Sequence, residues 1–166
     1  MSFPVIFVAN KFLEVAGLYE LDPLKLQKLI YFAHGWHLAN NETPLIKENF
    51  EAWPYGPVVP ELYESTKSWG SSKIDSYLNG GLYPKQLLNG NNEASVFATT
   101  IIRSVWSRYW KFSGLALSQI THLEDSPWTT VRKDNPHVYR PEIPNDLILS
   151  YFKSLMKSND GTAKPK

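Results

Sequence analysis

The sequence predicts a mainly α-helical fold: a single compact helical domain packed around a central buried helix, with a small β-hairpin or short strands as a minor addition. Three observations support this prediction. Apolar residues recur at helical spacing along much of the chain. Residues 24–38 are apolar on nearly every side, which is typical of a helix at the centre of its domain. A chain of 166 residues also buries roughly two-thirds of its unfolded surface, so it needs no disulfide or metal to fold.

The first two helices carry recognisable start and stop signals. The first is expected over residues 4–16, because apolar side chains share one face there, and Gly17 is a suitable stop. The central helix is expected to begin after Asp22, whose carboxylate can cap it, with Pro23 at the first helical position. It is expected to run to Leu38 and to be the core around which the other helices pack.

The rest of the chain is predicted from turn and cap signals. Residues 45–53 fit a brief strand, and the proline content of residues 53–60 excludes a helix interior or a central strand. A helix is expected over residues 61–69, and turns are expected within residues 71–92, around an extended segment at 74–78. The later helices are expected at residues 93–112, 115–122, from Pro127 onward behind a Ser126 cap, and 144–156.

The composition excludes several classes of protein. Basic and acidic residues number 17 and 16, so the net charge is +1, and without a basic stripe we expect no direct nucleic-acid binding. The absence of cysteine excludes disulfides, thiolate zinc sites and cysteine catalysis. No apolar run approaches the roughly 18 residues of a membrane span, and the N-terminus lacks the pattern of a signal peptide. We expect a cytoplasmic protein with one domain over residues 1–157 and a disordered polar tail at 158–166.

Two lysines at the start of the central helix are candidate functional residues. Lys25 and Lys28 lie in its first turns, where the helix dipole disfavours positive charge. One interpretation is a charged anchor, either for an acidic group of a partner or for the loop at residues 51–57. The other interpretation, which we favour, is a pair of solvated lysines whose stems cover apolar surface.

The loop at residues 51–57 is a candidate contact surface. Two X-Pro bonds and a glycine restrict its shape while it presents two aromatic rings. Rigid aromatic side chains lose little entropy when a partner binds. We expect the ring of Trp53 to fold inward, whereas Tyr55 fits an inward position and a binding role equally well.

The histidines allow two further hypotheses. His34 and His37 are three residues apart on a helix, but no neighbouring ligands complete a metal site, so we expect no metal or cofactor. His122 and Glu124 could act as the acid/base pair of a hydrolase. We favour hydrogen bonds that fasten the loop ahead of Trp128. Without a nucleophile elbow, a phosphate-cradling loop or a dinucleotide fingerprint, the sequence predicts no enzyme.

Three segments taken together resemble a known family. They are LKLQKLIYFAHGWHL at residues 24–38, FEAWPYGPVVPELY at residues 50–63, and Leu117-Ser118 with THLE and SPW at residues 121–128. In this order and spacing they are similar to the Panacea domain of SocA-like antitoxins, which includes the phage-associated GepA proteins. The resemblance covers about residues 3–152.

The resemblance implies a binding function. Such bacterial or prophage-encoded proteins are antitoxins of type II-like toxin–antitoxin systems, and they neutralise unrelated toxins by direct contact, so we expect a cognate protein toxin as partner. The alternatives are a phage-associated regulatory binding protein or an adaptor that delivers its toxin to an ATP-dependent protease. Some members carry a DNA-binding domain, which we do not expect here. The candidate motif or partner-binding residues, which serve either folding or binding, are Lys25, Lys28, Trp36, Trp53, Tyr55, Gly56, Pro57, His122, Glu124 and Trp128.

Overall fold

The computed structural model describes residues 1–79 and 92–158, and it confirms the mainly helical fold. Its helices are α1 (Val5–Ala16), α2 (Pro23–Asn41), α3 (Pro60–Thr66), α5 (Glu93–Tyr109), α6 (Gly114–Thr121), α7 (Pro127–Asp134) and α8 (Asn145–Lys157), with a 3₁₀ turn, η1 (Lys67–Trp69), after α3. The strands β1 (Phe50–Trp53), β2 (Gly56–Val58) and β3 (Glu142–Ile143) form an antiparallel sheet in the order β2-β1-β3. Among these residues, no helix combines the length and the apolar character that crossing a membrane requires.

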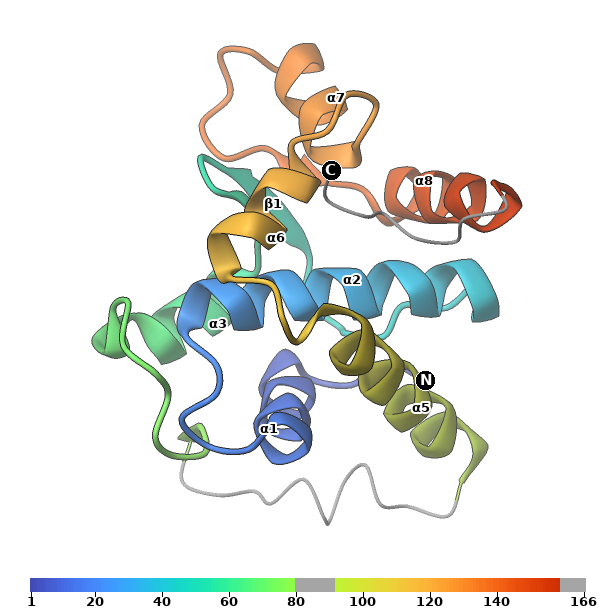
Figure 1. The fold of residues 1–166 in the computed structure, drawn as a ribbon. Coiled ribbons are helices and arrows are strands. Elements are labelled where there is room, and N and C mark those ends of the chain that lie inside the picture. Colours follow the sequence, from blue (N-terminus) through green and yellow to red (C-terminus); the bar gives the residue numbers. More distant parts are fainter. Residues whose placement is uncertain (80–91, 159–166) are drawn as a thin grey trace.

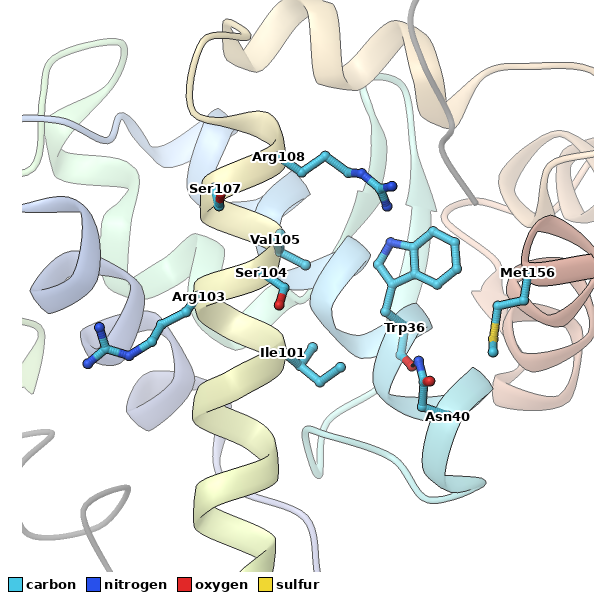
Figure 2. Close-up of a pocket in the computed structure, with 9 residues that line it drawn as sticks. All are labelled: Trp36, Asn40, Ile101, Arg103, Ser104, Val105, Ser107, Arg108 and Met156. Atoms are coloured by element: carbon cyan, nitrogen blue, oxygen red, sulfur yellow. Dashed lines mark hydrogen bonds between the residues drawn. The ribbon is translucent and has the colours of Figure 1, made fainter. Parts of the chain in front are cut away.

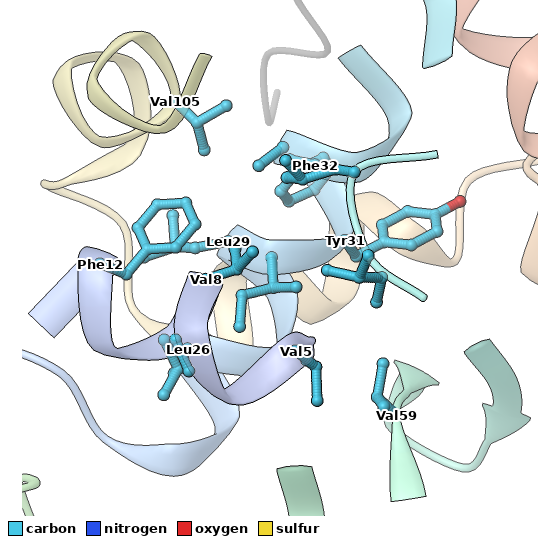
Figure 3. Close-up of a cluster of buried hydrophobic side chains, with 14 of the residues drawn as sticks. Val5, Val8, Phe12, Leu26, Leu29, Tyr31, Phe32, Val59 and Val105 are labelled. Atoms are coloured by element: carbon cyan, nitrogen blue, oxygen red, sulfur yellow. The ribbon is translucent and has the colours of Figure 1, made fainter. Parts of the chain in front are cut away.

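Helix α2 lies in the middle of the fold, as predicted. In Figure 1, α1 and α5 lie on one side of it, and the sheet, α6, α7 and α8 lie on the other. Every residue from Lys25 to Ala39 is buried. Figure 3 shows how the core forms where apolar side chains from α1, α2 and α5 meet, among them Val8, Phe12, Leu29, Phe32 and Val105.

The predicted cap signals act where they were expected. Asp22 accepts a hydrogen bond from the backbone N–H of Lys25 at 2.9 Å, and Pro23 opens α2. Ser126 caps α7 in the same way, through the N–H of Thr129. Helix α2 continues past the predicted Leu38 to Asn41, because α8 packs beside this part of it.

Several predicted boundaries differ from the structure. Residues 74–78 form no strand, since Ile74 bonds the backbone of the loop before α2 and Leu78 bonds the side chain of Asn10. Strand β3 was not predicted, because its two residues are too short for a pattern. The predicted helices over residues 61–69 and 93–112 end earlier as regular α-helices, at Thr66 and Tyr109. The turns expected at residues 80–91 and the tail at 159–166 lie outside the described residues.

The contact between α2 and α8 depends on two small features of α2. Gly35 faces the ring of Phe152, and a Cβ at this position would overlap the ring. One residue earlier, the buried His34 holds the start of α8: its Nε2 lies 2.8 Å from Asn145 Oδ1, and its Nδ1 accepts the N–H of Ile46. Burial lowers the pKa of His34 to about 4, because an imidazolium is poorly solvated there.

His34 is expected to make the protein sensitive to acid. Between about pH 6.5 and pH 4 the unfolded chain binds a proton at this histidine and the folded chain does not, so stability falls as the pH falls. The full loss from this one group is about 3 kcal/mol. Urea unfolding at pH 4.5, 5.5 and 6.5 should therefore show that the free energy of unfolding depends less steeply on pH in His34→Gln than in the wild type. The exposed His137 supplies the control, and His137→Gln should keep the wild-type slope; equal slopes for all three proteins would contradict this role of His34.

A pinned hairpin as the candidate binding site

The proline-rich motif at residues 53–57 forms the turn of the β1–β2 hairpin. Trp53 pairs with Gly56 across a two-residue turn. Gly56 has φ 106°, a conformation that glycine adopts without strain. A Cβ at Gly56 would overlap the hydroxyl of Thr121 and lie 3.1 Å from Lys28 Cε. Both the backbone and the close approach of α2 and α6 therefore require glycine here.

Side chains from three helices bond the carbonyl oxygens of this turn. Trp128 Nε1 donates to the Trp53 carbonyl at 2.7 Å, Ser118 Oγ donates to the Tyr55 carbonyl at 2.6 Å, Lys28 Nζ donates to the Pro57 carbonyl at 2.7 Å, and His122 Nε2 lies 3.1 Å from the Pro54 carbonyl. The Pro54 and Tyr55 carbonyls belong to the turn, and Pro57 lies on the edge strand β2, so these bonds satisfy groups that would otherwise need water. The turn is thereby held from α2, from α6 and its C-cap, and from α7.

Lys28 is the buried member of this set. Its side chain is fully buried, so the expectation of a solvated lysine is wrong, and the alternative of an anchor for the loop describes what the structure contains. Burial lowers its pKa to about 7. Lys28 is therefore a donor to the hairpin, and near pH 7 it is only partly charged.

Helix α2 also covers the outer edge of β2. The amide of Gln27 pairs with the backbone of Val59 in both directions, with its Nε2 donating to the carbonyl and its Oε1 accepting the N–H, each at 3.1 Å. Pro57 has no N–H to offer, and its carbonyl is taken by Lys28. An edge strand covered in this way cannot pair with a further strand. Any partner of this hairpin must therefore contact its side chains.

His122 and Glu124 are not assembled as a catalytic pair. His122 Nδ1 lies 2.6 Å from the Ser118 carbonyl, its Nε2 faces the Pro54 carbonyl, and its ring packs 3.8 Å from that of Trp128. Glu124 is exposed, and within residues 1–79 and 92–158 no hydrogen bond or ion pair joins it to His122. His122 thus fastens the segment ahead of Trp128 to the hairpin.

Two of the candidate residues lie away from the hairpin. Lys25 is buried, contrary to the solvated interpretation: its Nζ donates to the Trp110 carbonyl at 2.6 Å and lies 5.2 Å from the centre of the Trp106 ring. Burial lowers its pKa. Lys25 therefore holds the end of α5. Trp36 lies farther along α2, beside Arg108 of α5.

The outward side of the hairpin carries a group of aromatic side chains. Tyr55 at the turn is 65% exposed, whereas Trp53 is buried as predicted. The Trp53 ring packs edge-on against Tyr63 at 4.9 Å, and the Arg140 guanidinium stacks over it at 3.6 Å. Arg140 also covers Tyr139, which is 80% exposed. We call the set Trp53, Tyr55, Tyr63, Tyr139 and Arg140 the hairpin surface.

The sequence did not predict all the residues of the hairpin surface and its support. Arg140 and Tyr139 lie more than eighty positions from Trp53 in the chain, so no local pattern links them to the loop. Arg140 has φ 51°, a conformation that is uncommon for a residue with a side chain and is often found at functional sites. Ser118, inside a motif that we had noted, was not singled out as a hairpin donor, because serine in a helix usually bonds its own backbone.

A family model described as Antitoxin SocA-like, Panacea domain, matches residues 26–129. The chain belongs to this family. It is also 30% identical over 131 residues to a protein named Antitoxin SocA from Caulobacter vibrioides (strain NA1000 / CB15N), which covers 75% of this chain and 68% of that relative. No solved structure matches the chain.

The Panacea domain match includes all the side chains that bond the hairpin carbonyls, from Lys28 to Trp128. Tyr139 and Arg140 lie outside the matched residues. The matched residues therefore include the whole support of the hairpin, whereas Tyr139 and Arg140 of the hairpin surface lie beyond them.

Lys28 is expected to make the protein more stable as the pH rises. Between about pH 7 and 10.5 the unfolded chain carries a proton on this lysine that the folded chain lacks, so stability increases by about 1.4 kcal/mol per pH unit. Lys28→Met removes the titrating group. Urea unfolding at pH 7, 8 and 9 should therefore show that its free energy of unfolding rises less steeply with pH than that of the wild type.

The exposed Lys47 supplies the control, because Lys47→Met removes one ammonium group without touching the hairpin. This variant should keep the wild-type dependence on pH. If Lys28→Met follows the wild type as well, the Lys28 ammonium group is not desolvated by the hairpin.

Proposed function

We propose that this chain is the antitoxin of a type II-like toxin–antitoxin system and that it neutralises a cognate protein toxin by binding it through the hairpin surface, in the cytoplasm. Membership of the SocA-like antitoxin family supports the general role. The observation that supports the binding site is the set of hairpin carbonyls, each held by a side chain from another element, beneath an exposed tyrosine.

The physical argument rests on rigidity and composition. Ordering a loop when a partner binds costs free energy, and a turn whose carbonyls are already bonded avoids most of this cost. Tyrosine, tryptophan and arginine are also the residue types that contribute most at protein interfaces. The stacked Arg140 and Trp53 add a flat, already packed area to the hairpin surface. These features favour a stable protein–protein contact over a transient one.

The same contacts favour binding over catalysis. An acid/base histidine needs a ring nitrogen that is free to reach a substrate. In His122 both ring nitrogens face backbone carbonyls, and the ring packs on Trp128. We therefore infer that this protein acts without chemical turnover, and the hydrolase alternative stays a prediction with no supporting contact among the described residues.

Tyr55 is expected to be a binding hot spot. Tyr55→Ala should weaken toxin binding about 30-fold, because truncating a central aromatic anchor costs on the order of 2 kcal/mol. The candidate toxin is the protein encoded by the neighbouring reading frame. The measurements are the affinity of the purified pair and the growth of cells that express both proteins.

Tyr19 provides a matched control for Tyr55. It is 66% exposed in the loop between α1 and α2, so Tyr19→Ala removes the same side chain from another part of the surface and should leave affinity and rescue unchanged. Both variants should keep the wild-type unfolding temperature. A Tyr55→Ala protein that binds and rescues normally would exclude the hairpin surface. Failure of the wild type to rescue growth from the toxin would exclude the function itself.

The adaptor alternative differs in the fate of the toxin. If neutralisation is by binding alone, the half-life of the toxin after synthesis is blocked should be equal or longer in cells that contain this protein. A shorter half-life that depends on an ATP-dependent protease would identify the protein as an adaptor instead.

A further inference from the structure

Arg140, the cation of the hairpin surface, has no polar partner in the part of the chain that the structure describes. Its guanidinium carbon lies 3.6 Å from the centre of the Trp53 ring and 4.7 Å from that of Tyr139. Within residues 1–79 and 92–158, no hydrogen bond or ion pair joins its side chain to an acceptor, and its buried Nε has no partner. A guanidinium has five N–H donors and no acceptor, so it is suited to pair with a carboxylate or a carbonyl oxygen.

Two features of Arg140 are unfavourable in the protein alone. Its backbone has φ 51°, in the left-handed region that residues with a Cβ seldom adopt. Its buried Nε–H has lost contact with water without gaining an acceptor, which is also costly. Strained residues of this kind cluster at binding and catalytic sites. The rings of Trp53 and Tyr139 stabilise the guanidinium in this position, so it is already placed before a partner binds.

Two carboxylates lie on neighbouring strands, and no ion pair joins either of them to Arg140. Glu51 and Glu142 are opposite each other in the register of β1 and β3. The Glu51 carboxylate accepts the Trp53 Nε1–H at 2.6 Å. Glu142 is exposed, so water and salt screen its charge. Within the described residues, the charge of Arg140 is therefore not neutralised by direct pairing.

We propose that the hairpin surface recognises an acidic side chain of its protein partner, whose carboxylate accepts hydrogen bonds from the Nη groups of Arg140. This inference rests on the proposed function, because it names the chemistry of the partner at the same surface. A guanidinium stacked on a ring keeps the edge of its plane for the two parallel bonds that arginine makes with a carboxylate. Tyr139 lies beside this edge and shields the pair from water once a partner covers it.

A carboxylate fits this surface better than the phosphates of a nucleic acid. A nucleic-acid strand is bound by several cations in a row. Here Arg140 is a single cation, and Glu51 and Glu142 on the neighbouring strands repel a run of phosphates. One carboxylate on a folded partner needs only one guanidinium.

The first test measures the affinity of the full chain for the toxin encoded by the neighbouring reading frame. Arg140→Met keeps an unbranched side chain over Trp53 and removes the charge, so it should weaken binding at least about tenfold. Arg140→Lys keeps the charge without the planar fork and should weaken binding several-fold. Glu142→Gln removes a charge that repels the carboxylate of the partner, so its affinity should equal or exceed that of the wild type.

Arg103→Met is the matched control, because Arg103 is exposed and extends from α5 on the side away from Trp36 (Figure 2). It should change the affinity by less than about twofold. All variants should keep the helix content of the wild type by circular dichroism. Wild-type affinity in Arg140→Met, or equal losses in Arg140→Met and Arg103→Met, would overturn the inference. A weaker affinity in Glu142→Gln would overturn it in favour of a cation on the partner.

A second test needs no toxin, so its outcome is separate from that of the proposed function. The Nε–H resonance of Arg140, assigned with Arg140→Lys, is followed by NMR while the peptide acetyl-Gly-Asp-Gly-amide is added at millimolar concentrations. We expect this resonance to shift and saturate, whereas the resonance of Arg103 stays in place. The same peptide with asparagine should cause no shift.

The outcomes of the second test are distinct. No shift of the Arg140 resonance, an equal shift with the asparagine peptide, or a larger shift with an oligothymidylate would overturn the inference. A wild-type chain that shows the expected shift but neither binds the toxin nor rescues growth would overturn the proposed function and keep the carboxylate site.

Discussion

Complete burial of α2 is the constraint on which the other contacts depend. A polar side chain on a buried helix must find a partner inside the protein, because water cannot reach it. Gln27 finds the backbone of Val59, Lys28 finds the Pro57 carbonyl, and His34 finds Asn145. These partners belong to the hairpin, to the segment that follows it and to α8. Burying one helix therefore also sets the position of the hairpin and of the last helix.

The hairpin is held by hydrogen bonds to its backbone, which has a consequence for binding. Its carbonyls are bonded by Lys28, Ser118, His122 and Trp128, while the side chain of Tyr55 stays exposed. The residue type at position 55 is therefore nearly independent of the hydrogen bonds that hold the backbone of the turn. A fold of this kind can keep the support while the exposed residue at the turn changes. The hairpin surface offers exposed rings and one stacked guanidinium on a rigid turn, which favours a broad contact with a folded protein.

Local signals in the sequence determined the helices, the buried character of α2 and the short strand before the proline-rich turn. Caps such as Asp22 and Ser126 act within a few residues, so a linear pattern contains all the information that they need. The partners of Lys25 and Lys28 could not be predicted in this way. Each lysine bonds a carbonyl far away in the chain, about eighty-five positions away for Lys25 and about thirty for Lys28. The residues around a lysine are the same whether its ammonium group bonds such a carbonyl or water. The stacking of Arg140 on Trp53 and the convergence of Arg108 with Trp36 were likewise decided by tertiary structure. Contacts between distant segments depend on how helices pack, and packing is a property of the whole chain.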